Sequence, residues 1–360
     1  EEDKRPNKSI ALYRCHNIIL RDFSILHGGW FGLLATGADN LTVDNVKMDT
    51  NRDGMDIDCC QNVRISNCSI NSPFDDGICL KSSYGLNTGR ATENVTITNC
   101  QVSGFDEGSF LDGTFKRDVN RYGDGGGGPT GRIKFGTESN GGFKNITISN
   151  CVFVYCRGLA LETVDGALLE DVTINNITMR DVVNAPIFVR LGARMRGPAG
   201  TPVGTLQRVI ISNVVCYNND PRQAAIISGI PGHNINDLTL SNIRIYYRGG
   251  GTAQQGQREV PGLEKEYPEP MRFGITPAYG FFVRNVTDLK MKDVEIHYMN
   301  DEQRVPIILD NIDGADLEHM RAQRAKGAPA IRLNNVKGFV IHNSHDIADT
   351  RLGSVSKKDL

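Results

Sequence analysis

Three aspartates in two short segments have the residue type and spacing best suited to catalysis. Asp53 lies in Asn51-Arg52-Asp53-Gly54, and the pair Asp75-Asp76 begins 22 residues later. The sequence repeats at this interval, so we expect Asp53 and Asp75 to occupy equivalent positions on neighbouring strands, about 4.8 Å apart. Glycoside hydrolysis needs two carboxyl groups, one protonated for the leaving oxygen and one ionised to act on water or carbon. Crowding of like charges raises the pKa of one carboxyl group and so prepares the acid.

Two other interpretations apply to this acidic region. Asp56 and Asp58 follow on the same segment, and we interpret them as residues that cap turns, a common role of Asp. The three carboxylates of Asp53, Asp75 and Asp76 would also suit Ca²⁺, because a hard cation binds oxygen ligands. Catalysis is the favoured role for these three residues, and a calcium site is its rival.

Short repeats must position these residues. A phrase of the form Asn-Val-x-Ile-x-Asn recurs along the chain, and its apolar residues alternate with polar ones, which is typical of a strand with one buried face. A strand this short cannot bury that face alone, so the copies are expected to stack. Clear copies begin at Asn40, Asn62, Asn94 and Asn145, and weaker ones at Asn17, Asp171, Arg208, Asp237 and Asp288.

The repeats predict an all-β fold, a right-handed single-stranded parallel β-helix. The Asn or Asp that closes each phrase should form a ladder of side chains at a turn. Cys68, Cys100 and Cys151 each follow such an Asn, so we expect them to stack in the core instead of forming disulfides. No segment shows a sustained 3.6-residue apolar period, which excludes a helical bundle.

Four stretches interrupt the repeat and are expected to form long side loops, which on a solenoid commonly carry function. They cover residues 84–91, 103–131, 191–206 and 248–280. We expect one continuous domain over residues 1–360. The repeats begin almost at the first residue, so we expect an N-terminal cap or the first coils to be missing from this sequence.

Composition narrows the classes of function. Lys and Arg number 40 against 42 Asp and Glu, for a net charge of −2, and the cations are scattered, which argues against a nucleic-acid partner. No apolar run approaches the roughly 20 residues of a membrane span. The nine cysteines lack metal-finger spacing, so no zinc site is predicted. We expect a monomer without a cofactor.

These motifs together resemble glycoside hydrolase family 28, the polygalacturonases and rhamnogalacturonases. Asn51-Arg52-Asp53-Gly54 is similar to the family's Asn-Thr-Asp-Gly, Asp75-Asp76 to its Asp-Asp pair, and Phe135-Gly136-Thr137-Glu138 to its Ile-Gly-Ser-Glu. The resemblance implies that Asp75 is the general acid, and that Asp53 and Asp76 orient and deprotonate the attacking water. The implied reaction is hydrolysis with inversion, without a metal or organic cofactor.

The sequence also departs from the family's pattern. The family's Gly-His-Gly before Phe135 is absent, and the stretch 105–131 occupies its place. Ala160 and Glu162 stand where the family's Arg-Ile-Lys would supply two cations for a uronate carboxylate. Plain polygalacturonate is therefore a poorer expectation than a rhamnose-containing or branched pectic substrate. Arg132-Ile133-Lys134 lies in another coil, although its two cations could still face the groove.

Several further residues are candidates for binding the substrate. For Arg190 a solvated turn explains the residue equally well, and for Trp30 a sugar platform and core packing are equal alternatives. The substrate-binding candidates are Asn51, Lys81, Arg132, Lys134, Glu138, Glu162 and Arg190.

The sequence thus predicts a secreted or periplasmic inverting glycosidase that acts on a pectin-type cell-wall polysaccharide. The side loops favour exo-action, because they could close one end of the groove. A β-helix polysaccharide lyase acting on a uronate-containing glycan is one rival. A non-catalytic glycan-binding solenoid is the other.

Overall fold

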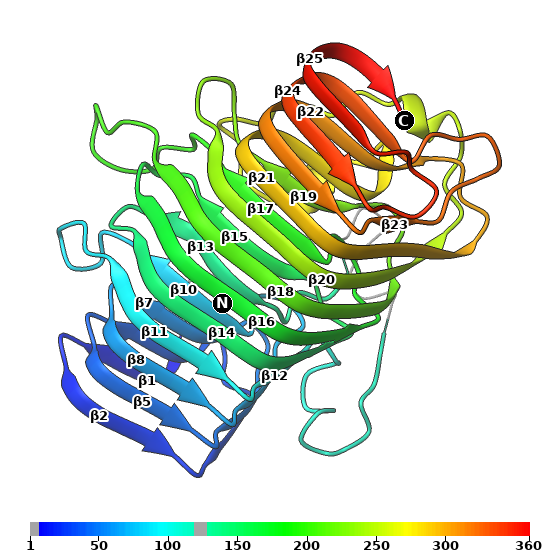
Figure 1. Cartoon of the computed structure of the whole chain (residues 1–360). Coiled ribbons are helices and arrows are strands. Elements are labelled where there is room, and N and C mark those ends of the chain that lie inside the picture. Colours follow the sequence, from blue (N-terminus) through cyan, green and yellow to red (C-terminus); the bar gives the residue numbers. More distant parts are fainter. Residues whose placement is uncertain (1–6, 119–127) are drawn as a thin grey trace.

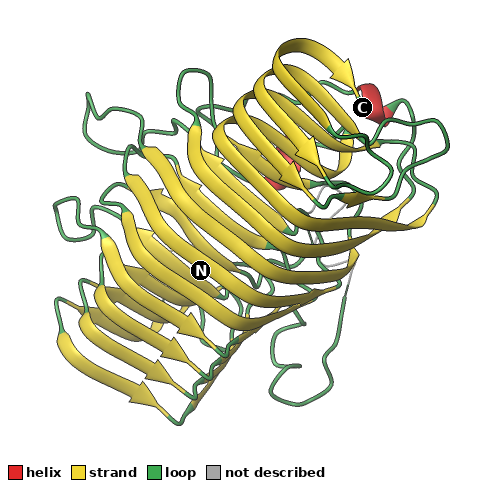
Figure 2. Ribbon diagram, in the orientation of Figure 1, coloured by secondary structure: helices red, strands yellow, loops and turns green. Residues whose placement is uncertain are grey.

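The computed structural model describes residues 7–118 and 128–360, and their strands stack as the coils of a parallel β-helix (Figure 1). Away from the two ends of the solenoid, each strand pairs in parallel with the strand one coil before it and the strand one coil after it, so the pairings run in three series along the solenoid. Figure 2 shows that strands make up nearly all the regular structure. The prediction of a parallel β-helix is confirmed.

The first series consists of β1 (Lys8–Tyr13), β4 (Phe31–Thr36), β7 (Asp53–Asp58), β10 (Ile78–Ser82), β13 (Ile133–Ser139), β15 (Leu159–Thr163), β17 (Ile187–Leu191), β19 (Ala225–Ser228) and the first parts of β21 (Ala278–Asn300), β22 (Val305–Glu318) and β24 (Ile331–His342). The second series consists of β2 (His16–Arg21), β5 (Asp39–Asp44), β8 (Gln61–Ser66), β11 (Thr92–Thr98), the first parts of β14 (Phe143–Val154), β16 (Leu168–Arg180), β18 (Thr205–Asn219) and β20 (Ile235–Gly249), and later parts of β21, β22 and β24. The third series consists of β3 (Ser24–Leu26), β6 (Lys47–Asp49), β9 (Ser69–Asn71), β12 (Gln101–Ser103), the last parts of β14, β16, β18, β20 and β21, and β23 (Arg321–Ala322).

The core consists of columns of apolar side chains that run from coil to coil. In the second series Ile65 pairs with Ile97, Ile97 with Ile148, and Ile148 with Ile174. All four are fully buried, which is the period-two pattern read from the sequence. Each coil supplies only one residue to such a column, so burial of the column depends on the stacking of successive coils.

The turns bear out the predicted asparagine ladder. Asn67, Asn99, Asn150, Asn176 and Asn213 have φ values between 55° and 58°, in the left-handed region that Asn tolerates better than most residues. Their amides bond from coil to coil, as in Asn176 to Asn150 at 3.0 Å and Asn213 to Asn176 at 3.2 Å. Cys68, Cys100 and Cys151 are buried and unpaired, as expected.

The side loops lie where the sequence placed them, between β10 and β11, β12 and β13, β17 and β18, and β20 and β21. The loop 192–204 follows β17, a strand of the first series. The loop 250–277 follows β20, whose last part belongs to the third series, and it holds the short 3₁₀ helices η2 (Gln255–Gln257) and η3 (Pro270–Phe273). β25 (Thr350–Asp359) pairs antiparallel with β24 at the red end of Figure 1. None of the described helices is long and apolar enough to cross a membrane.

Candidate active site

The three predicted aspartates meet on the first series of strands. Asp53 begins β7, and Asp75 and Asp76 lie in the turn before β10. One oxygen atom from each of the three carboxylates lies within 4.8 Å of the other two. The expected convergence is therefore present, and we call Asp53, Asp75 and Asp76 the acidic cluster.

The register of these strands differs by one residue from the expected alignment. Met55 pairs with Ile78, an interval of 23 residues, so Asp76 lies level with Asp53 and Asp75 lies level with Arg52. Gly54 permits this close stacking, since a Cβ atom there would lie 2.4 Å from the carbonyl oxygen of Gly77. The aligned pair is thus Asp53 and Asp76, which corrects the expectation of Asp53 over Asp75.

Asp76 is held in its ionised form by two buried cations. Its carboxylate lies 2.9 Å from Nε of Arg132 and 3.2 Å from Nζ of Lys134. Burial alone would raise the pKa of Asp76, but Lys134 and Arg132 outweigh it and lower that pKa to about 2. Asp76 therefore carries a negative charge at any pH at which the protein would work.

Asp53 has the opposite electrostatic environment. It is only 6% exposed, and burial raises its pKa well above the usual value. The charges of Asp56, Asp75 and Asp76 raise that pKa further, while Lys81 opposes them. Neighbouring carboxyl groups thus have pKa values pushed apart, which is the arrangement that separates a proton carrier from a permanent anion.

Asp75 is the most accessible member of the acidic cluster, with 27% of its side chain exposed. Its Oδ2 lies 2.7 Å from Nη2 of Arg52, and the Arg52 guanidinium lies 4.4 Å from the centre of the Trp30 ring. Trp30 is 45% exposed, so the alternative that it packs in the core is excluded. Its ring contacts Arg52, which in turn pairs with Asp75, and it lies on the coil before the cluster.

Of the two residues interpreted as turn caps, only Asp58 has that role. Asp58 accepts hydrogen bonds from the backbone and hydroxyl of Ser83, at 2.8 and 2.7 Å, and caps the turn as predicted. Asp56 is instead a buried residue within β7, with its carboxylate 2.7 Å from Nζ of Lys81. Burial raises the pKa of Asp56 to about 6, although Lys81 opposes this rise. The interpretation of Asp56 as a turn cap is wrong.

The loop 250–277 folds back over the strands next to the acidic cluster. Glu269 from this loop lies 2.5 Å from Arg132 and 3.1 Å from Arg157. The Tyr267 hydroxyl lies 3.3 Å from Nζ of Lys134 and accepts a hydrogen bond from Thr137 at 2.9 Å. The sequence predicts this loop but not its contacts, because no pattern in the sequence shows how far back along the solenoid the loop reaches.

Two predicted substrate contacts are corrected by this loop. Glu162 is fully buried, 3.7 Å from Lys134 and 3.9 Å from Arg132. Arg190 is also buried, and it donates hydrogen bonds to the Gly262 and Leu263 carbonyl oxygens of the loop. Neither side chain can reach a ligand in this conformation. Glu162 supports the cations around Asp76, and Arg190 anchors the loop.

The remaining candidates surround the acidic cluster. Arg132 and Lys134 are buried beneath the loop and support Asp76, while Lys81 pairs with Asp56 and lies 3.8 Å from Glu138. The amide of Asn51 donates to Glu107, in the loop between β12 and β13, at 2.9 Å. Of this set, Glu138, Lys81 and Asn51 retain some exposure.

Cationic side chains of the protein would compete with a calcium ion for the carboxylates of the acidic cluster. In the described ranges, the cluster is the one group of three potential metal ligands that comes together. Arg52, Arg132 and Lys134 already pair with two of its carboxylates, so most of its negative charge is neutralised by protein. This donor set fits a proton-transfer site better than a metal site.

Comparisons with known proteins agree with this architecture. A family model described as a right handed beta helix region matches residues 5–120. A polygalacturonase of Cochliobolus carbonum is 25% identical to this chain over 177 residues, which are 48% of this chain and 40% of the relative. The chain resembles glycoside hydrolase family 28.

Two solved structures share the fold of this family 28-like protein. The exopolygalacturonase of Thermotoga maritima superposes with a TM-score of 0.57 at 16% identity, covering 80% of this chain and 54% of that chain. The family 28 exopolygalacturonase of Yersinia enterocolitica gives a TM-score of 0.59 at 13% identity, covering 89% and 48%. The chain spans about half the length of the relatives it matches. The predicted right-handed β-helix is confirmed.

Proposed function

We propose that this protein hydrolyses a glycosidic bond of a pectin-type saccharide at the acidic cluster. The observation that carries the proposal is the meeting of Asp53, Asp75 and Asp76 within 4.8 Å, with opposite electrostatic environments for Asp53 and Asp76. A structural solenoid needs no such cluster. The polygalacturonase names of its relatives support pectin as the substrate class.

One proton shared by Asp53 and Asp75 accounts for both catalytic tasks. In the resting state the raised pKa of Asp53 keeps the proton on Asp53, and the carboxyl group of Asp75 pairs with Arg52. Binding of the substrate displaces Arg52, and the proton passes to Asp75, which faces the solvent. Asp75 then protonates the leaving oxygen as the glycosidic bond breaks. Water attacks the anomeric carbon and gives its proton to Asp53, while Asp76 orients the water.

The stereochemical proposal depends on where that water lies. Inverting carboxyl pairs usually stand about 6.5–9.5 Å apart, and retaining pairs about 5–5.5 Å apart. The 4.8 Å of the acidic cluster joins single oxygen atoms, not whole carboxyl groups, so it selects neither class. We place the water beside Asp53 and Asp76, on the side from which Asp75 does not approach, and propose inversion.

A sugar without a carboxylate fits the cluster best. Around it, within the described part of the chain, Lys81, Arg132 and Lys134 are each paired with a carboxylate. A uronate carboxylate would have to displace one of these partners, at a cost in free energy. We therefore propose a rhamnose-containing or branched pectic substrate in preference to plain polygalacturonate.

Exo-action is supported by the loop 250–277. Its residues Tyr267 and Glu269 contact Lys134 and Arg132 one coil beyond the cluster, so a long chain could not continue along the first series of strands. Because pectin is a polysaccharide outside the cytoplasm, we also propose a secreted or periplasmic location.

The direct test is a screen of defined pectic oligosaccharides with identification of the products. The proposal expects reducing ends to appear without a conjugated double bond, and Asp75→Asn to abolish them. A product with a conjugated double bond would establish the lyase alternative. No product from any substrate, with binding intact, would establish a non-catalytic solenoid.

A further inference from the structure

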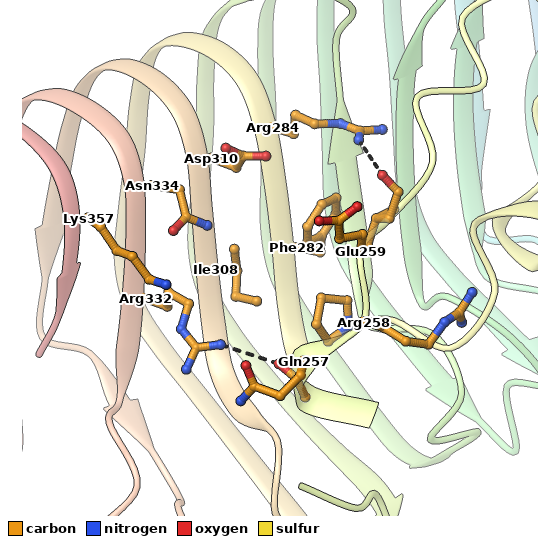
Figure 3. A pocket seen from close by; sticks show the side chains of 13 residues that line it. Gln257, Arg258, Glu259, Phe282, Arg284, Ile308, Asp310, Arg332, Asn334 and Lys357 are labelled. Carbon is orange, nitrogen blue, oxygen red and sulfur yellow. Dashed lines mark hydrogen bonds between the residues drawn. The ribbon is translucent and has the colours of Figure 1, made fainter. Parts of the chain in front are cut away.

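A second cavity lies on the first series of strands, on the other side of the loop 250–277 from the acidic cluster. It has a volume of about 400 Å³, within the range of small-ligand sites. Strands β21, β22, β24 and β25 form its floor, and loop residues 256–260 form a wall (Figure 3).

Two rows of side chains across these strands make the floor. Arg284 pairs with Asp310, Asp310 with Asn334, and Asn334 with Lys357. These four side chains therefore form one row, about 14 Å long at the usual spacing of neighbouring strands. A second row, two residues earlier on each strand, contains Phe282, Ile308 and Arg332.

The two arginines of the floor are occupied by the protein. Arg284 donates to the carbonyl oxygens of Val260 and Pro261 at 3.1 and 3.0 Å, which fixes the loop wall. Arg332 donates to Asp359 at 3.1 Å and to the Gly256 carbonyl oxygen at 3.3 Å. Figure 3 shows both contacts with the loop at the edge of the cavity.

The other three polar side chains of the row have no such partner. Within residues 7–118 and 128–360, the side chains of Asp310, Asn334 and Lys357 form no hydrogen bond or ion pair, although all three line the cavity. Burial raises the pKa of Asp310, and Arg284 opposes that rise. A half-buried carboxyl group, an amide and an ammonium group thus face one cavity with their bonding capacity unused.

We propose that this cavity binds an acidic sugar of one or two rings. A sugar carboxylate would bind at the end of the row formed by Lys357. Sugar hydroxyl groups would donate hydrogen bonds to the side-chain oxygens of Asn334 and Asp310. The apolar face of the ring would lie on Ile308, next to Phe282. A neutral sugar would leave the ammonium group of Lys357 without its partner.

This site is separate from the acidic cluster. Four strand-to-strand steps, from β15 through β17, β19 and β21 to β22, separate Glu162 from Asp310, which is about 19 Å at the usual spacing. The loop between the two sites is bonded to Arg190 and Arg284. The inference therefore does not depend on which reaction the cluster performs.

Calorimetric titration of the full chain with galacturonate, and with galactose as a neutral probe, tests the site. We expect galacturonate to bind at about 10 mM or below and at least 10-fold more tightly than galactose. Lys357→Met and Asn334→Leu should each weaken galacturonate binding about 10-fold, whereas the control Lys358→Met should not, because the side chain of Lys358 lies on the opposite face of β25.

Binding that is unchanged in both Lys357→Met and Asn334→Leu would overturn the inference. Equal binding of galactose and galacturonate, or no binding of galacturonate, would also overturn it. The Asp75→Asn variant separates the two proposals, because it should lose hydrolysis and keep this binding. If no pectic substrate is cleaved but the Lys357-dependent binding is present, the proposed function fails and the second site stands.

Discussion

Nη2 of Arg52 lies 2.7 Å from Oδ2 of Asp75 and places a cation on the most accessible carboxylate of the acidic cluster. The same guanidinium covers the exposed ring of Trp30 at 4.4 Å. A sugar ring that stacked on Trp30 would displace Arg52 from both partners. Arg52 thus links binding at Trp30 to the accessibility of the Asp75 carboxyl group.

Replacing Arg52 with Thr should therefore change the binding of the substrate. Without the guanidinium over Trp30 and beside Asp75, a sugar ring has no cation to displace, so KM should fall several-fold. The control is Arg208→Thr, which removes an arginine paired with Asp171 on the second series. An unchanged KM for Arg52→Thr would rule out this role.

Glu162 should make the stability of the folded state depend on pH. Burial raises its folded-state pKa from 4.5 to about 7, although Lys134 and Arg132 oppose the rise. The folded state then binds more protons than the unfolded state between these values, so stability falls as the pH rises from 4.5 to 7. The free energy of unfolding falls by about 3 kcal/mol over this range, at about 1.36 kcal/mol for each unit by which the pKa rises.

Glu162→Gln should remove that fall. Denaturant unfolding at pH 4.5 should give nearly equal free energies for variant and parent, and unfolding at pH 7 should favour the variant. Asp310 is also a carboxyl group with a raised pKa, but it is only partly buried, so Asp310→Asn provides the control with a smaller effect. A variant that is least stable at pH 7 would show that the ionised Glu162 stabilises the fold.

Tyr267 should help the loop 250–277 to restrict the enzyme to exo-action. Its hydroxyl bonds Thr137 and lies near Lys134, so Tyr267→Ala should open the wall formed by the loop 250–277. The products from a long pectic substrate should shift from monosaccharides toward longer fragments, as measured by chromatography of early time points. Tyr217→Ala, which alters an exposed tyrosine of the third series, should leave the product pattern unchanged. Longer fragments from the unmodified protein would contradict exo-action.

Chelation separates hydrolysis by carboxylates from metal-dependent chemistry. The cations of Arg52, Arg132 and Lys134 already pair with the acidic cluster, so we expect full activity after treatment with a chelator. Activity that is lost on chelation and restored by Ca²⁺ would instead favour the lyase alternative.

The sequence predicted those features that repeat. The alternation in Asn62–Ser66 and its copies predicts both the strands and the stacking, because each coil must bury the same column of side chains. The three aspartates could be found because they lie in two successive coils. A one-residue change in the turn before β10 was enough to hide which of them are level.

Contacts between distant segments could not be read from the sequence. Arg132 and Glu269 are 137 residues apart, and no periodic pattern relates a proline-rich loop before β21 to the strand β13, four coils earlier. Glu162 was expected to line the groove because it stands where the family's Lys would bind a uronate carboxylate. The loop covers that position, so the residue is buried among cations. The same loop creates the second cavity, which no sequence motif marks.

The most direct test of the catalytic account is the configuration of the first sugar released. Proton NMR of the anomeric signals, recorded before the products mutarotate, should show inversion with the unmodified protein. Asp75→Asn should lower turnover by about 10³-fold or more with an unchanged melting temperature, since a general acid contributes 10²–10⁴. Retention of configuration, or near-normal turnover by Asp75→Asn, would contradict the roles given to the acidic cluster.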